Sequence, residues 1–133
     1  MLYNPRSLNN NVSEVMMYMQ DRHIDIAGIC ESWLTGTNTP TTATIKRYGY
    51  KIIYTFRHDK MGGGTAILYK SHLSLSKVTF STIVKTFEYT AALSKTIKSS
   101  KILFVIIYRS IQHQNLYLKL MHLLLKLSSN VIV

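Results

Sequence analysis

Acidic side chains are scarce in this sequence, in which six Asp and Glu stand against sixteen Lys and Arg and the formal net charge is +10. An excess of this size favours a polyanionic partner, either a nucleic acid or an anionic membrane surface. Cysteine is almost absent too: Cys30 is the single one. No disulfide can form within the chain, so a reducing compartment is expected. Because Cys30 lies in an apolar run, we expect a small buried hydrophobic side chain there.

Long apolar runs and metal-binding patterns are also missing. No run approaches the ~20 residues that a membrane-spanning helix needs. The sequence turns polar at Asn4, so no signal peptide is predicted at the start of the chain. The five histidines are scattered and match no zinc-ligand spacing. We therefore expect an intracellular protein, nuclear or cytoplasmic, that is neither secreted nor inserted in a membrane and binds no small-molecule cofactor.

Hydrophobic periodicity predicts alternating helices and strands over the 133 residues, a length that suits one domain or part of one. The spacing of Val12, Val15, Met16 and Met19 predicts a helix over roughly residues 10–22. Residues 24–30 are predicted to form a buried strand. The stretch 35–44, rich in Thr, Gly, Asn and Pro, predicts a loop.

The rest of the chain is predicted to be mostly strands. Residues 48–54 and 64–69 flank a glycine-rich turn and predict a hairpin. Further strands are expected over 73–80 and 86–97. The apolar run 102–107 is typical of a strand covered on both faces. A second amphipathic helix is predicted over roughly 114–127, followed by the start of a strand at 131–133. The pattern indicates an α/β fold.

One carboxylate stands out, because Glu31 directly follows the buried strand and Trp33 follows it two residues later. Two interpretations are open. Glu31 can be an ordinary strand-end residue that pairs with one of the many cations. It can also be a metal ligand, because hard cations such as Mg²⁺ take one or two carboxylates together with water and substrate phosphate.

Two further polar residues follow apolar stretches in a similar way. Asn4 comes just after a short strand-like segment, and Tyr108 comes just after the most apolar run. In a layered α/β domain, ligands gather where strands end and loops begin. Each residue also has a simpler explanation, since Asn before Pro is common in turns and Tyr is common at the rim of a sheet.

The order of these stretches resembles the endonuclease/exonuclease/phosphatase superfamily, specifically the apurinic-type endonuclease domain of LINE-like non-LTR retrotransposons. The resemblance covers essentially the whole chain, and the Glu-Ser-Trp-Leu and triple-glycine stretches at this separation are together fairly specific. The stretches that carry it are Asn4–Leu8, Asp25–Leu34, Gly49-Tyr50, Arg57–Ala66, Phe87-Glu88 and Ile107–Arg109.

The resemblance implies a four-layer α/β sandwich, in which two mixed sheets lie face to face with helices outside. It implies that Glu31 ligates Mg²⁺ or Mn²⁺, that Asn4 lies near the metal, and that Tyr108 contacts the scissile phosphate. By the same resemblance, Arg6 and Arg109 would contact the phosphates of DNA, the implied partner. In a full-length relative, a reverse-transcriptase domain would follow.

The sequence also departs from the family pattern. Ser110-Ile111 stands where the family has proline, and Cys30 stands where threonine is common. The family's Gly-Asp-Phe-Asn stretch would come directly after Val133, and its Ser-Asp-His stretch later still. Those stretches carry the residues that activate water and stabilise the phosphorane. We therefore expect residues 1–133 to be a partial, truncated domain lacking its C-terminal part, and Glu88, in a strand, is not expected to substitute.

Three functions remain open on the sequence. The first is a truncated, Mg²⁺-dependent DNA-nicking endonuclease domain of retrotransposon origin, inactive as an isolated chain. The second is a basic remnant that binds nucleic acid without cutting it, for which the net charge of +10 is the reason. The third is a phosphatase or phosphodiesterase of the same superfamily, because one fold hosts all these activities.

Overall fold

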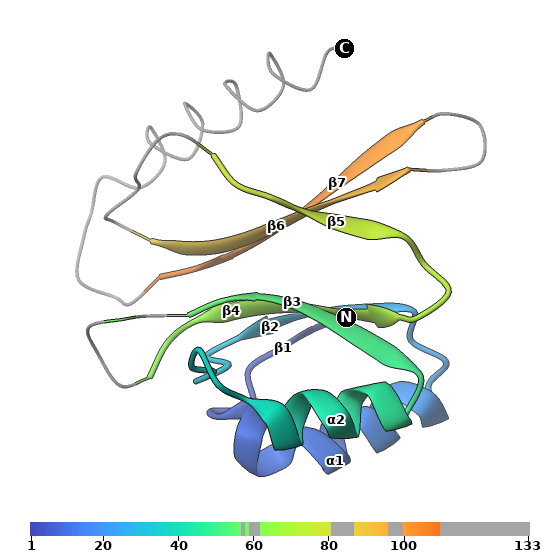
Figure 1. Cartoon of the computed structure of the whole chain (residues 1–133), viewed down its shortest axis with the longest axis vertical. Helices are drawn as coiled ribbons and strands as arrows, with labels where there is room; N and C mark the ends of the chain where they lie inside the picture. Colours follow the sequence, from blue (N-terminus) through green and yellow to red (C-terminus); the bar gives the residue numbers. More distant parts are fainter. Residues whose placement is uncertain (57, 59–61, 81–86, 96–99, 110–133) are drawn as a thin grey trace.

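Two β-sheets lie face to face, and two helices cover the outer face of the first (Figure 1). The computed structural model describes residues 1–56, 58, 62–80, 87–95 and 100–109. The predicted helix over 114–127 and the strand at 131–133 lie outside these residues. In chain order the elements are β1 (Leu2–Tyr3), α1 (Leu8–Asp21), β2 (Ile26–Cys30), α2 (Thr39–Arg47), β3 (Tyr50–Thr55), β4 (Thr65–Lys70), β5 (Leu75–Val78), β6 (Glu88–Lys95) and β7 (Lys101–Tyr108).

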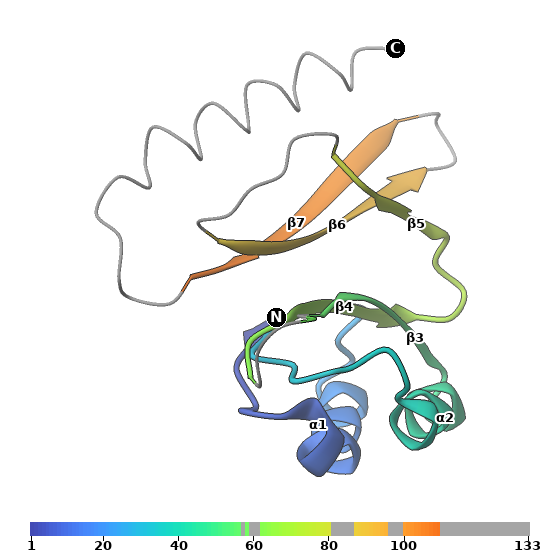
Figure 2. The same ribbon diagram turned by 60° about the vertical axis from the view of Figure 1, so that its left-hand side comes forward.

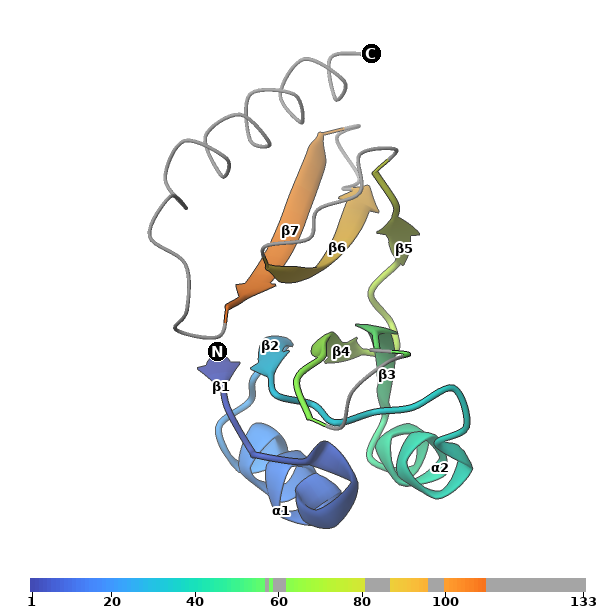
Figure 3. The ribbon, with the colours of Figure 1, turned by 90° about the vertical axis from the view of Figure 1, so that its left-hand side faces the viewer.

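The first sheet has the strand order β1-β2-β4-β3 and is mixed, because β1 pairs parallel with β2 while the other pairs are antiparallel. The second sheet has the order β5-β6-β7 and is antiparallel in its described strands. Figures 2 and 3 show both helices on the same side of the first sheet, with the second sheet on the other side. This arrangement confirms the α/β class and the stacked sheets that the sequence predicted.

Helix α1 packs on the first sheet through the apolar stripe that the sequence predicted. Its buried residues are Leu8, Val12, Val15, Met16 and Met19, which repeat at helical spacing. The stripe joins residues of β2 and β4 in one hydrophobic cluster between the helix layer and the sheet. The helix begins two residues earlier than predicted, because a carbonyl in the loop after β2 accepts the first N–H group of the helix. Leu8 N–H donates to Ser32 O at 2.8 Å.

The prediction of a loop over residues 35–44 is wrong, because α2 begins within this stretch at Thr39. Pro40 lies in the first turn, where a missing N–H group costs nothing. The threonine hydroxyls bond to backbone carbonyls of the preceding turn: Thr42 Oγ1 donates to Asn38 O and Thr44 Oγ1 to Pro40 O. Ile45, only 1% exposed, anchors the helix in the core. Tertiary packing at that residue outweighs the low helix propensity of the threonines.

The strand β7 also differs from its prediction, because its residues from Leu103 onward are half-buried rather than fully covered, and Ile102 is 47% exposed. One face of the strand packs against the first sheet, where Phe104 and Ile106 join Ile67 and Ala92 in a second hydrophobic cluster. The residues of the opposite face, Leu103, Val105 and Ile107, pack with Phe87 in a third cluster. The hairpin of β3 and β4, in contrast, agrees with its prediction.

The two sheets approach closely at Gly28 in β2. A Cβ atom there would lie 2.3 Å from Cδ1 and 2.9 Å from Cγ1 of Ile106 in β7. We expect Gly28→Ala to lower the free energy of unfolding by about 1–3 kcal/mol, the usual cost of overpacking. Urea titration of the single and double variants measures it. The loss should shrink when Ile106→Val removes the clashing methyl group, and strictly additive losses would contradict this contact.

Candidate active site

Glu31 is the first residue after β2, and backbone hydrogen bonds join its loop to two other segments. Ser7 N–H donates to Glu31 O at 3.1 Å, which joins the start of α1 to this loop. Ser32 N–H donates to Gly64 O at 3.1 Å and Trp33 N–H to Gly63 O at 2.9 Å, which join the loop to the start of β4. The Glu31 carboxylate therefore projects from a braced turn at the end of the first sheet.

Glu31 and Tyr108, separated by 77 residues in the chain, meet in the structure. The Tyr108 hydroxyl, at the end of β7, donates a hydrogen bond to Glu31 Oε1. The other carboxylate oxygen, Oε2, accepts the indole N–H of Trp33 at 3.4 Å. This contact joins the two sheets at one end, where the last residue of a strand in the second sheet touches the residue after a strand in the first.

Asn4 and Arg6 lie on the connection between β1 and α1, beside the Glu31 loop. The side-chain oxygen of Asn4 accepts the Arg6 N–H at 3.1 Å, a local turn bond, and both side chains are exposed. The segment reaches the Glu31 loop through the backbone bond from Ser7. The structure thus pairs Glu31 directly with Tyr108 and places Asn4 and Arg6 on the neighbouring segment, and the chemical roles of all four stay predictions.

Backbone strain is concentrated in these same segments. Arg6 and Ser7 have φ of 48° and 98°, and Glu31 and Trp33 both have φ of 53°. Positive φ is uncommon for residues other than glycine and costs free energy, especially at a bulky residue such as tryptophan. Such strain persists where the surrounding structure imposes it, and it clusters at functional sites. The strained backbone supports a functional role for the Glu31 loop, and this support does not depend on any motif.

Arg109 follows Tyr108 directly and carries unsatisfied hydrogen-bond donors. Its Nε and Nη2 atoms are buried and have no hydrogen-bond partner in the part of the chain that the structure describes. Buried donors without a partner are rare in proteins, and a guanidinium is best satisfied by an anion such as phosphate. This observation suits the predicted phosphate contact of Arg109, which stays a prediction.

Glu88 is joined to the segment that supports the Glu31 loop. It lies in a strand, as expected, where it is the first residue of β6 and stands opposite Tyr108 in the β6–β7 register. Its Oε2 accepts the N–H of Gly64, which is the residue whose carbonyl holds Ser32. A strand-end side chain can thus reach across to the other sheet, and the expectation that Glu88 does not substitute for the missing groups stays a prediction.

The glycines of the β3–β4 connection are required by this packing. Gly64 has φ of +80°, and a Cβ atom there would lie 2.9 Å from Ser32 Oγ and 3.2 Å from Thr55 O. Gly62 has φ of +84°, and a Cβ atom there would lie 3.6 Å from Nε1 of the Trp33 indole. In the triple glycine, the backbone therefore comes close to the Glu31 loop and supports it.

The donor atoms present suit a magnesium ion better than a zinc ion. Across the described ranges there is no group of three or more His, Cys, Asp or Glu side chains that could enclose a metal. Magnesium does not require one, since it is commonly held by one or two carboxylates plus water and substrate phosphate. Each Glu31 oxygen accepts one hydrogen bond and keeps a second lone pair for a cation.

Cys30, beside Glu31, is not equipped as a nucleophile. Its side chain is buried in β2, and burial raises the pKa of the thiol, with the negative charge of Glu31 adding to the rise. A raised pKa keeps the thiol protonated, and the thiolate is the reactive form. The prediction of a small buried hydrophobic side chain at this position is confirmed.

The two-sheet α/β fold is similar to the folds of solved exonucleases and of an apurinic endonuclease. The chain is similar to the 3′ phosphatase NExo from Neisseria bound to a product DNA hairpin (TM-score 0.55, 19% identity, 77% of this chain and 38% of that one). It is also similar to an AP endonuclease from Archaeoglobus fulgidus (TM-score 0.58, 16% identity, 95% of this chain and 48% of that one).

A third solved structure, the 3′-5′ exonuclease NExo from Neisseria meningitidis, is similar to the same extent (TM-score 0.53, 17% identity, 77% of this chain and 38% of that one). The chain therefore spans less than half the length of each of these proteins. No protein-family model matches the sequence, and no curated protein matches it either. At these identities the likeness establishes the fold. No helix in the described part of the chain is long and apolar enough to cross a membrane.

Proposed function

We propose that this chain supplies the metal-holding half of a phosphodiester-cleaving site that acts on DNA. The observation that carries the proposal is the contact between Glu31 and Tyr108 across the two sheets, together with Arg109, the residue after Tyr108, whose Nε and Nη2 atoms are buried without a partner. A carboxylate, a hydroxyl and a guanidinium at one strand end are the groups that bind a cation and a phosphate together. The DNA complex of the similar NExo structure supports DNA as the partner.

Each residue has a defined task in this proposal. Bound Mg²⁺ or Mn²⁺ would supply positive charge against the charge that develops on the phosphate during hydrolysis. Glu31 would hold the ion, and Tyr108 orients the carboxylate through its hydrogen bond. Arg109 donates to a phosphate oxygen, while Asn4 and Arg6 approach from the β1–α1 connection. In hydrolysis water adds to phosphorus, the bond to the leaving oxygen breaks, and that oxygen takes a proton.

The proton-transfer groups are not part of this set, which is why we propose that the chain alone is inactive. Losing a general base costs about 10²–10⁴-fold in rate, and losing a charge-stabilising donor costs about 10²–10³-fold more. The finer proposal is an endonuclease domain of a non-LTR retrotransposon, in which a reverse transcriptase would follow. Its support is the Glu-Ser-Trp-Leu stretch at Glu31–Leu34 together with Gly62–Gly64, which pack against each other.

A supercoiled-plasmid nicking assay tests the proposal. In Mg²⁺ the isolated chain is expected to leave the plasmid intact, and a longer protein that includes the second half of the fold is expected to nick it. Nicking by the longer protein should disappear in Glu31→Gln and persist in Glu14→Gln, which removes an exposed carboxylate on α1. Equal nicking by the longer protein with and without Glu31 would overturn the assignment.

Two other functions keep a specific observation in their favour. A non-catalytic nucleic-acid-binding role is favoured by the net charge of +10. It predicts that DNA binding survives Glu31→Ala and that no extension of the chain restores cleavage. A phosphatase role is favoured by the 3′ phosphatase among the similar structures. It predicts release of inorganic phosphate from a 3′-phosphorylated strand without nicking.

A further inference from the structure

Trp33 is a large aromatic residue that stays at the surface of the molecule. It is 40% exposed, while the next residue, Leu34, is only 4% exposed and belongs to the hydrophobic cluster between the helices and the first sheet. Leu34 therefore anchors the loop after β2 in the core, and the burial of Trp33 is not what holds this loop. An exposed indole beside a candidate active site is a candidate contact for a ligand.

The indole of Trp33 is nevertheless held in a defined position. The backbone at Gly62 comes close to it, since a Cβ atom there would lie 3.6 Å from Nε1 and 3.7 Å from Cε2 of the ring. The Trp33 backbone N–H donates to Gly63 O at 2.9 Å, and the indole N–H donates to Glu31 Oε2 at 3.4 Å. The ring is thus fixed through its backbone and its nitrogen while part of its surface stays open to solvent.

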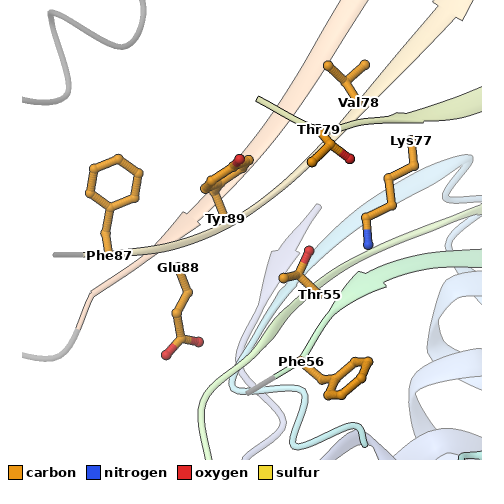
Figure 4. A pocket seen from close by; sticks show the side chains of 8 residues that line it. All are labelled: Thr55, Phe56, Lys77, Val78, Thr79, Phe87, Glu88 and Tyr89. Atoms are coloured by element: carbon orange, nitrogen blue, oxygen red, sulfur yellow. The ribbon is translucent and has the colours of Figure 1, made fainter. Parts of the chain in front are cut away.

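The loop that carries Trp33 is supported further along the chain as well. Phe56 follows the end of β3, as Figure 4 shows, and a Cβ atom at Gly36 would lie 3.6 Å from Cζ of its ring. The Thr35 N–H donates to Asn38 Oδ1 at 2.9 Å. Because the loop is already ordered, a ligand that contacts the indole does not have to immobilise it, and this favours binding.

The surroundings of Trp33 restrict the kind of ligand. Exposed tryptophans also serve in contacts with proteins and membranes, but such contacts use an apolar patch. The exposed residues that follow Trp33 in its loop are Thr35, Gly36 and Thr37, which extend no such patch. On the other side lies the carboxylate of Glu31. A single flat ring among polar groups suits a ligand that is itself flat and carried on a polar backbone.

We propose that Trp33 stacks on an unpaired nucleobase of the DNA strand whose phosphate is held at Glu31. The indole nitrogen touches the Glu31 carboxylate, so a strand bound there passes within reach of the ring. An aromatic side chain stacks on any base, because every base has a π-face. In a duplex the neighbouring base pairs cover both faces, so the substrate class is single-stranded or locally opened DNA. This inference rests on the proposed DNA-cleaving function.

Tryptophan emission tests the stacking directly, because Trp33 is the single tryptophan of the chain. The whole chain is titrated with a single strand of about eight nucleotides, in EDTA at fixed salt, and stacking is expected to quench the emission. A strand of the same length with abasic sites in place of its bases should bind through its phosphates without quenching. A paired duplex should also bind without quenching. Equal quenching by all three would overturn the proposal.

Variants separate stacking from general attraction to DNA. By anisotropy of labelled strands, the unchanged chain is expected to bind the base-bearing strand at least about fivefold more tightly than the abasic strand. Trp33→Leu should reduce this ratio to about twofold or less. Trp33→Phe removes the N–H group that bonds to Glu31 but keeps an aromatic ring, so it should retain most of the ratio.

The matched control is Tyr18→Leu, which removes another exposed aromatic ring, on α1. Its ratio should equal that of the unchanged chain. A ratio that survives Trp33→Leu, a ratio near one in the unchanged chain, or no binding of either strand would overturn the proposal. A ratio lost equally in Trp33→Phe and Trp33→Leu would also overturn it, because the indole N–H and not the ring would then be the required group.

The measurement also separates this inference from the proposed function. It is made without divalent metal, so it does not depend on cleavage. A ratio that depends on Trp33, without Glu31-dependent nicking in the longer protein, keeps the stacking and removes the nuclease. Glu31-dependent nicking without such a ratio keeps the nuclease and removes the stacking.

Discussion

Replacing Glu31 with glutamine is expected to weaken the binding of Mn²⁺ at the candidate site by at least about 100-fold, because removing even a group that only supports a metal ligand costs 10–100-fold. The substitution keeps the size of the side chain and one carbonyl oxygen but removes the negative charge that attracts the cation. It also leaves the Tyr108 hydroxyl an acceptor at the same place, so the sheet-to-sheet contact is retained.

The chain offers its own probe for this measurement. Trp33 is the single tryptophan, and its indole nitrogen lies 3.4 Å from Glu31 Oε2. Mn²⁺ quenches indole fluorescence at short range, so a titration of tryptophan emission should follow occupation of the site. Mg²⁺ should reverse the quenching by competition, because both ions prefer oxygen ligands.

The control for this experiment is Glu14→Gln, which removes the same charge from the exposed side of α1. Quenching in this variant should match the unchanged chain. If Glu31→Gln still shows saturable quenching at the same concentrations, the carboxylate is an ordinary strand-end residue, which is the simpler of the two interpretations that the sequence left open.

The parts of the fold that local patterns determine could be predicted from the sequence. The apolar run before Glu31 gives β2, and the stripe from Val12 to Met19 gives α1, because burial of one face decides both. The helix α2 was missed because its threonines favour other conformations, and the burial of Ile45 that holds it is a tertiary effect. Composition cannot report a contact made across the fold.

The candidate site shows the same division. The end of β2 could be found from the sequence, and so Glu31 could be singled out by position. Its contact with Tyr108 across 77 residues followed only from a resemblance, because no local pattern encodes it. Glu88 belongs to one of the stretches that carry the resemblance, but its bond to Gly64, which spans 24 residues and two sheets, could not be read from any local pattern. A chain with few acidic residues makes every carboxylate at a strand end worth testing as a site residue.

DNA binding by the chain is expected to fall about 150-fold between 50 and 200 mM salt, if four phosphates are neutralised and the slope of log K against log salt is about −3.6. The net charge of +10 supplies the cations; among them, Arg6 precedes Ser7, which bonds to the Glu31 carbonyl, and Arg109 follows Tyr108, which bonds to the Glu31 carboxylate. Counterion release, rather than any base contact, is the source of this dependence.

Single variants test how much each cation contributes to this slope. Arg6→Gln and Arg109→Met should each reduce its magnitude by about 1 if the residue contacts a phosphate. Lys51→Met, on β3 and away from the Glu31 loop, should leave the slope unchanged and serves as the matched loss of one charge. The measurement is anisotropy of a labelled duplex at several salt concentrations without divalent metal. A slope near zero would exclude DNA as the polyanionic partner, and an unchanged slope in both arginine variants would place the binding surface away from Glu31.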